Sequence, residues 1–119
     1  MSQSFVAGDN LMFQLESGYG LFRVLAVEGQ GANSVWHLST FEELFPDAES
    51  AERALLHPDL LHTGHAHLAL TDRAFERTPA AKLTNHPVAD SELIAYNLWT
   101  MEAERKVSDR SLLQLLGMR

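Results

Sequence analysis

Two glycine-rich turns constrain the fold of this chain more than any other feature of its sequence. They lie at residues 18–20 and 29–31, between runs that are rich in β-branched and aromatic residues. Turns spaced in this way predict three consecutive antiparallel strands over residues 11–15, 20–28 and 34–41. A meander of this kind favours a small barrel or a curved sheet.

Each predicted strand has an apolar face, because side chains alternate between the two faces of a strand. The second strand is apolar on both faces except at Arg23, which indicates a central place in the sheet. The expected core consists of the apolar residues that alternation brings to one face: Leu11, Phe13, Trp36, Leu38, Leu68 and Leu70.

The middle of the chain predicts a short helix. Asp47 can cap a helix over residues 48–56, and Pro58 would end it. An alternative start is Thr40, which opens a capping-box pattern with Glu43. The two starts place residues 40–47 in different structures.

The last part of the chain predicts two more strands and a C-terminal helix. The strands cover residues 65–71 and 82–88. The helix begins at Asp90 or Ser91, either of which can cap it, and continues to Lys106. Its apolar residues form two stripes at helical spacing: Ile94, Leu98 and Met101, and Tyr96, Trp99 and Ala103.

A helix with two apolar stripes needs cover on two sides. The sheet can cover one stripe. The leucine-rich segment at residues 108–116, or the same surface of a second copy, can cover the other. We therefore expect a homodimer through the C-terminal helices, in which the C-terminal leucines take part.

These elements predict one α+β domain over residues 1–119. We expect a strongly bent antiparallel sheet of about five strands, SH3-like or an open barrel, with the C-terminal helix packed on it. The length of 119 residues suits a single domain.

Composition excludes several classes of protein. The chain carries 16 acidic and 9 basic residues, a formal net charge of −7, so we expect no binding to nucleic acid, which requires clustered cations. It contains no cysteine, which excludes disulfides and cysteine-ligated zinc and fits the cytoplasm. The N-terminus resembles no signal peptide, and no apolar run approaches the roughly 20 residues of a membrane span.

The strongest candidate for chemistry is a group of histidines. On a strand, His65 and His67 project from one face, and His37 shares that face if the third and fourth strands are neighbours. Imidazoles placed in this way can bind zinc or another divalent metal, with Asp72 or His86 as a further ligand. The alternative is a set of partly buried histidines hydrogen-bonded to the backbone, with no cofactor.

A catalytic site is not indicated. Ser39 and Thr71 lie near histidines in the alternation and Asp72 follows, but the chain has no nucleophile elbow of the Gly-x-Ser-x-Gly type. We therefore assign no catalytic residue.

Several short segments carry a resemblance to a known group of proteins. They are Gly8-Asp9, residues 37–41, residues 64–71 and residues 92–99. In these the chain resembles a group of small uncharacterised bacterial proteins, and its Gly-Asp opening and meander resemble predicted immunity proteins of bacterial toxin systems. The resemblance implies a small cytosolic β-rich domain with a C-terminal helix, and it implies no catalytic residues.

Two functions are consistent with these patterns. The first is a non-catalytic protein-binding module, for which the resemblance implies an immunity-like role. The sequence does not identify its partner. The alternative is a metal-binding protein or an enzyme that uses the histidine-rich face of the sheet, through His37, His65 and His67.

Overall fold

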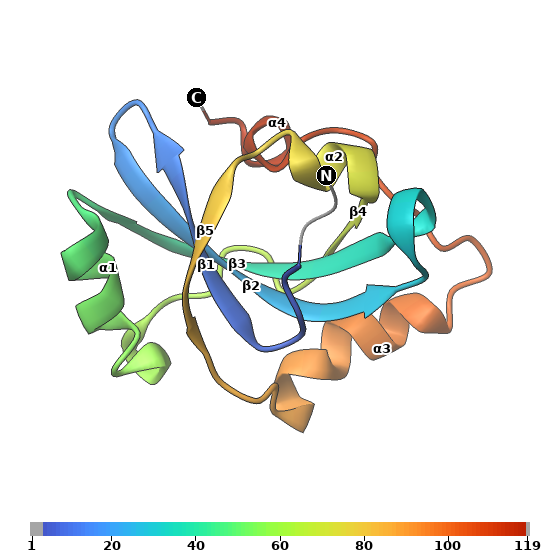
Figure 1. Ribbon diagram of the computed structural model, residues 1–119. Helices are drawn as coiled ribbons and strands as arrows, with labels where there is room; N and C mark the ends of the chain where they lie inside the picture. Colours follow the sequence, from blue (N-terminus) through green and yellow to red (C-terminus); the bar gives the residue numbers. More distant parts are fainter. Residues whose placement is uncertain (1–3, 119) are drawn as a thin grey trace.

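The computed structural model describes residues 4–118 and shows an antiparallel sheet with short helices on both faces (Figure 1). The strand order is β4-β3-β2-β1-β5, so the second strand is central, as predicted. This arrangement confirms the α+β class and the five antiparallel strands. The strands are β1 (Asp9–Leu15), β2 (Gly18–Glu28), β3 (Val35–Phe45), β4 (Leu68–Thr71) and β5 (Ala80–Asn85).

The helices are all short. Within residues 4–118, none is long and apolar enough to cross a membrane. They comprise four α-helices and three 3₁₀ turns in the described residues: η1 (Gly31–Asn33), α1 (Ala48–Ala54), η2 (Pro58–Leu60), α2 (Asp72–Glu76), η3 (Asp90–Leu93), α3 (Ile94–Thr100) and α4 (Leu112–Leu116).

The first turn of the meander depends on two glycines. Leu15 pairs with Gly18 across a two-residue loop, and Gly18 has a φ of +144°, which disfavours any residue with a side chain. A Cβ atom on Gly20 would lie 2.5 Å from the Phe13 ring. Gly20 therefore allows the first two strands to approach closely where Phe13 crosses β2.

The cap at Asp47 decides between the two predicted helix starts. The Asp47 side chain accepts a hydrogen bond of 2.7 Å from the Ser50 amide and begins α1. Thr40 is instead a buried residue of β3, which continues to Phe45. The alternative start at Thr40 is therefore wrong, because pairing of β3 with β2 as far as Tyr19 takes the backbone bonds that a helix would need.

The sheet is open and not strongly curled, so the expected SH3-like or open barrel is not observed. Closure would require β4 to meet β5, but these strands form opposite edges of the sheet. The physical reason is that helices fill the space on one face. Phe75 of α2 and Leu112 of α4 are buried against the strands there, so the sheet buries that face without curling onto itself.

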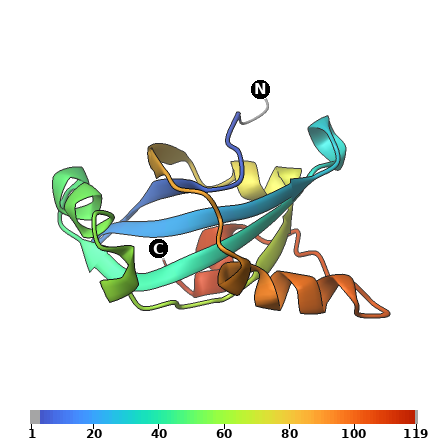
Figure 2. The same ribbon diagram turned by 90° about the horizontal axis from the view of Figure 1, so that it is seen from below.

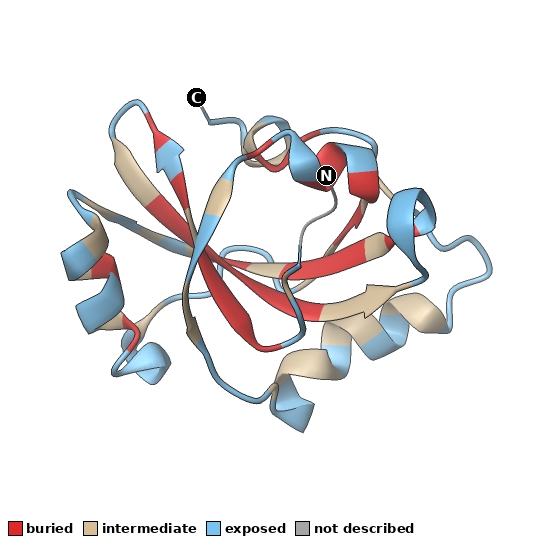
Figure 3. Cartoon of the chain, in the orientation of Figure 1, coloured by how far each residue is buried: buried red, intermediate tan, exposed pale blue. Residues whose placement is uncertain are grey.

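That face carries the main core (Figure 3). Trp36 stacks on Phe75 with ring centroids 3.9 Å apart, and its Nε1 donates to Asp72 at 2.9 Å. Of the six predicted core residues, five are buried in this one cluster, and Leu68 is half-buried against it. Trp36 and Leu68 thus share a face, which confirms the predicted strand phases.

The opposite face is covered at its two ends by different helices (Figure 2). At one end, Leu21, Ala51 and Leu55 form a smaller apolar cluster under α1. At the other end lies α3, which has no fully buried residue. The sheet under α3 carries polar residues, and the candidate site lies there.

The C-terminal helix is shorter than predicted, ending at Thr100 and not at Lys106. The residues that follow favour a helix, but the chain turns back so that Ser108 can pair with the edge of β4. The Ser108 amide donates to Ala69 at 2.8 Å, and the Thr71 amide donates to Ser108 at 2.9 Å. These edge bonds override local helix propensity.

The C-terminal leucines also differ from expectation. Leu112 is buried in the main core, and Leu113, Leu115 and Leu116 are packed against it. They therefore lie on the face of the sheet opposite α3 and do not cover its second stripe. That stripe is exposed: Ile94 by 61%, Leu98 by 57% and Met101 by 75%.

The two tryptophans give a test of which face stabilises the fold. Trp36→Ala should lower the free energy of unfolding by about 3–5 kcal/mol, because it removes a buried ring and leaves Asp72 without its donor. Trp99→Ala, which truncates a half-buried ring under α3, should lower it by only about 1–2 kcal/mol. Urea unfolding measures both. Equal losses would contradict the assignment of the main core.

Candidate functional site

On the face covered by α3, three side chains are linked in a row by hydrogen bonds: Glu28, His37 and His67. We call this group the histidine chain. Glu28 ends β2, His37 lies on β3, and His67 directly precedes β4. Register brings them together, because His37 pairs with Ala69 on one side and Ala26 on the other. The predicted meeting of His37 and His67 is confirmed. The predicted strand over residues 65–71 begins only at Leu68, and His65, which was expected on the same face, is exposed and does not hydrogen-bond to either ring.

Both ring nitrogens of His37 are occupied. Nε2 lies 2.5 Å from Oε1 of Glu28, and Nδ1 lies 2.9 Å from Nε2 of His67. A carboxylate can only accept, so His37 donates through Nε2 and its Nδ1 accepts from His67. These neutral tautomers, assigned from the network, leave Nδ1 of His67 as the free end of the chain.

Helix α3 lies on this chain through two aromatic rings. The centroids of Tyr96 and Trp99 lie 4.6 and 4.7 Å from that of His37, and 5.8 and 5.6 Å from that of His67. His37 is fully buried as a result. The stripe of α3 that contains Tyr96 and Trp99 is therefore the one that meets the sheet.

Burial keeps both histidines neutral near pH 7. It lowers the pKa of His37, against the opposing effect of the Glu28 carboxylate. Burial, with a smaller contribution from His37, lowers the pKa of His67 to about 4. Burial and the Glu28 charge also raise the pKa of the Tyr96 phenol. Near pH 7 the site therefore contains two neutral imidazoles beneath α3.

The predicted zinc ligands are only partly brought together. The ring centroids of His37 and His67 are 5.1 Å apart and their facing nitrogens 2.9 Å, so the nitrogens lie near the line between the centroids. A zinc ion midway would lie about 1.5 Å from each nitrogen, well inside the 2.0–2.1 Å of a Zn–N bond. The geometry as it stands suits a shared proton, and a metal would require the rings to turn.

The other predicted ligands lie elsewhere. His65 is exposed, and Asp72 accepts from Trp36 on the main-core side. His86 is also exposed, with its Nδ1 3.4 Å from the amide nitrogen of Asn10. Among residues 4–118, no three His, Cys, Asp or Glu side chains are grouped so that they could hold a metal ion. Zinc binding stays a prediction.

The residues weighed as a nucleophile and its partners are also separated. Thr71 caps α2 by accepting from the Ala74 amide and donates to Asp109 at 2.7 Å. Ser39 lines a groove beside α3. No triad geometry links these two hydroxyls with Asp72, whose carboxylate accepts from Trp36.

A buried ion pair that the sequence analysis missed anchors the start of α3. Arg23 is 5% exposed, and its Nε donates to Glu92 of η3 at 2.5 Å. The same guanidinium donates to the carbonyls of Gly8 at 2.9 Å and His86 at 2.8 Å, and to Asn10 Oδ1 at 3.2 Å. The sequence contained one indication of this ion pair, an arginine in an otherwise apolar strand. A buried guanidinium needs hydrogen-bond acceptors at fixed positions.

A groove runs beside α3 on this face. Two adjoining cavities of about 380 and 470 Å³ form it, and Phe41, Thr63, Ser91 and Glu92 line both. Ile94 forms part of its wall and also begins the exposed stripe of α3. The groove and the stripe are therefore one continuous surface.

Comparisons with protein-family models, curated proteins and solved structures find no match for this chain. The resemblance to small bacterial proteins and to immunity proteins consequently stays a prediction.

The histidine chain predicts a loss of stability in acid. Because both folded-state pKa values lie below the ordinary 6.5, the unfolded chain binds more protons between about pH 6.5 and 4. The contribution of the two neutral histidines to the free energy of unfolding is complete above pH 6.5. It is lost as the pH falls toward about 4. For His67 we expect on the order of 2 kcal/mol, allowing for its partial exposure.

His67→Gln should remove most of this pH dependence, because the glutamine amide can still donate to His37 and does not titrate. His57→Gln is the matched control, because His57 is exposed and does not belong to the histidine chain. This variant should keep the wild-type dependence of the free energy of unfolding on pH. Urea unfolding between pH 4 and 7 measures both variants. An unchanged slope in His67→Gln would contradict the assignment.

Proposed function

We propose that this protein is a non-catalytic protein-binding module whose binding surface is the exposed stripe of α3 with the adjoining groove. The observation that carries this proposal is the exposure of three large apolar side chains on one short helix and its C-cap: Ile94, Leu98 and Met101. Contiguous apolar patches on soluble proteins mark interaction sites.

The anchoring of α3 supports the same function. A helix of seven residues is marginal alone, and this one is held by Glu92 at its start and by Tyr96 and Trp99 along its length. The outer stripe is thereby presented on a fixed backbone. A partner segment that binds a preformed surface loses less conformational freedom than one that must order it.

A crosslinking experiment tests this proposal. We expect a photo-crosslinking amino acid at Leu98 to give a protein adduct of defined mass in cell extract, and the same residue at Leu56 to give none. Leu56 is the matched control, since it is 72% exposed but lies outside the groove. Ile94→Glu should reduce the yield at position 98 by about tenfold or more, as loss of an interface anchor does.

Identical adduct patterns at the two positions would contradict a binding surface on α3. An adduct of two copies of this chain at position 98 would identify the partner as the predicted homodimer. In that case the contact is made by α3, because the C-terminal leucines lie in the main core.

The second candidate is metal binding or catalysis through the histidine chain, for which the observation is that His37 and His67 are neighbours. Metal binding would require the two rings to turn from their hydrogen-bonded positions. This candidate expects stoichiometric zinc or another divalent metal in the purified protein. It also expects His37→Gln to lose that metal, while His62→Gln, at an exposed histidine paired with Glu43, retains it. Elemental analysis tests metal binding, and less than about 0.1 metal per chain in the wild type would exclude a metal site with a dissociation constant below micromolar.

A further inference from the structure

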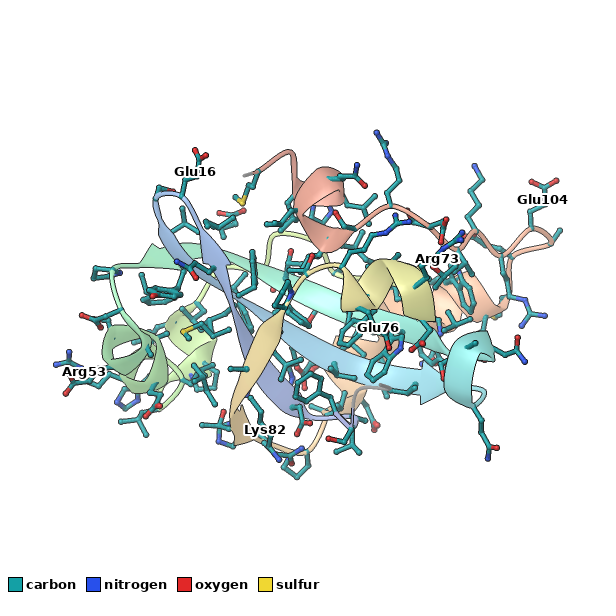
Figure 4. All side chains as sticks on the ribbon, turned by 45° about the horizontal axis from the view of Figure 1, so that its top comes forward. Glu16, Arg53, Arg73, Glu76, Lys82 and Glu104 are labelled. Carbon is teal, nitrogen blue, oxygen red and sulfur yellow. The ribbon has the colours of Figure 1, made fainter. Side chains whose placement is uncertain are left out.

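The apolar stripe of α3 is flanked by carboxylates. Asp90 begins η3, four residues before Ile94, and Glu102 lies in the turn after α3, four residues after Leu98. Asp59 of η2 lines the groove from the other side. All three acidic residues are exposed. Glu104, on the loop after α3, also points into solvent (Figure 4).

These carboxylates lack cationic partners. In the described part of the chain, none of Asp59, Asp90 and Glu102 forms a salt bridge. Arg23, the one arginine among residues 4–118 that lines the groove, is buried and paired with Glu92. Arg105 lies over the Trp99 ring, 5.9 Å from its centroid.

Lys106, whose carbonyl accepts from Trp99 Nε1 at 2.8 Å, adds a second cation beside Arg105 on the loop after α3. Other cations belong to more distant elements. Arg53, Arg73 and Lys82 belong to α1, α2 and β5 (Figure 4). Arg73 is paired with Asp109, and Lys82 lies 3.3 Å from Asp9. The surface around the α3 stripe is therefore apolar at its centre, with unpaired carboxylates at its Asp90 end and on the Asp59 side of the groove, and with charges of both signs on the loop after α3.

This charge pattern disfavours a second copy as the occupant. In a two-fold antiparallel pair of α3 helices, Asp90 of one copy would face Glu102 of the other. Like charges placed opposite one another oppose association, and each chain already carries a net charge of −7. A partner with cations at the corresponding places has the opposite effect.

We propose that the surface of α3 and its groove binds a cationic amphipathic helix of a partner protein. Such a helix would place two or three apolar residues, spaced i, i+4 and i+7, against Ile94, Leu98 and Met101, with Lys or Arg beside Asp90 and Glu102. This inference rests on the proposed binding function and adds the chemical class of the partner.

Two matched peptides test it. Each has 14 residues and the same leucine stripe, with lysine at every polar position of one and glutamate at every polar position of the other. In a ¹⁵N-edited NMR titration of the full chain, the lysine peptide should shift the resonances of Phe41, Thr63, Ile94 and Leu98. It should bind at least tenfold more tightly than the glutamate peptide, and weaken as salt is raised from about 0.05 to 0.5 M.

Charge reversal on the protein supplies the control. The double variant Asp90→Lys/Glu102→Lys should lose at least tenfold in affinity for the lysine peptide and gain affinity for the glutamate peptide. Glu16→Lys/Glu49→Lys changes the net charge equally but on exposed residues of the β1–β2 loop and α1, and it should lose much less.

Equal binding of the two peptides at α3 would overturn the cationic partner and leave the proposed binding function intact. Binding of neither peptide, or equal effects of the two double variants, would also overturn it. The crosslinking yield at Leu98 reports on the binding function separately, since it depends on no assumption about the partner's charge.

Discussion

The structure depends on a pair of long strands, β2 and β3, that need cover on both faces. They are the two longest strands of the sheet, at 11 residues each, and the other strands pair outward from them. Antiparallel sheets commonly leave one face to solvent. Here Arg23 and His37 are buried on the face opposite Trp36. Both faces are therefore covered, and the buried polar groups need hydrogen-bond partners.

The two faces satisfy that requirement by different means. The main-core face uses apolar area, with α2 and α4 as cover. The other face uses specific hydrogen bonds, because a buried guanidinium and a buried imidazole are costly without partners. Glu92 and Glu28 supply those partners. Arg23 and His37 thereby determine where η3 and α3 lie.

The placement of α3 leaves its outer stripe without cover. Tyr96 and Trp99 turn toward the histidines, so Ile94, Leu98 and Met101 necessarily turn outward on so short a helix. The polar chain under the helix and the apolar surface above it therefore have one cause. The same helix therefore covers His37 and His67 on one side and presents the proposed binding surface on the other.

The sequence by itself determined the strands, their apolar faces and the existence of the Asp47 helix. Alternation at Trp36 and Leu38 is a local property, and the cap at Asp47 depends only on its neighbours three residues on. Each of these depends on residues close together in the chain. The meeting of His37 and His67 also required the third and fourth strands to be neighbours, which alternation alone does not determine.

Only the tertiary structure decided the end of α3, the place of α4 and the partners of the buried polar groups. The end of α3 depends on Ser108 reaching the edge of β4, and α4 packs where Phe75 leaves apolar surface on the other face. Arg23 pairs with Glu92, which is 69 residues away in the sequence. His37 pairs with Glu28, and His65, the predicted co-ligand, does not hydrogen-bond to it. Local propensity carries no information about such pairs, because the energy that selects them exists only once distant segments are packed together.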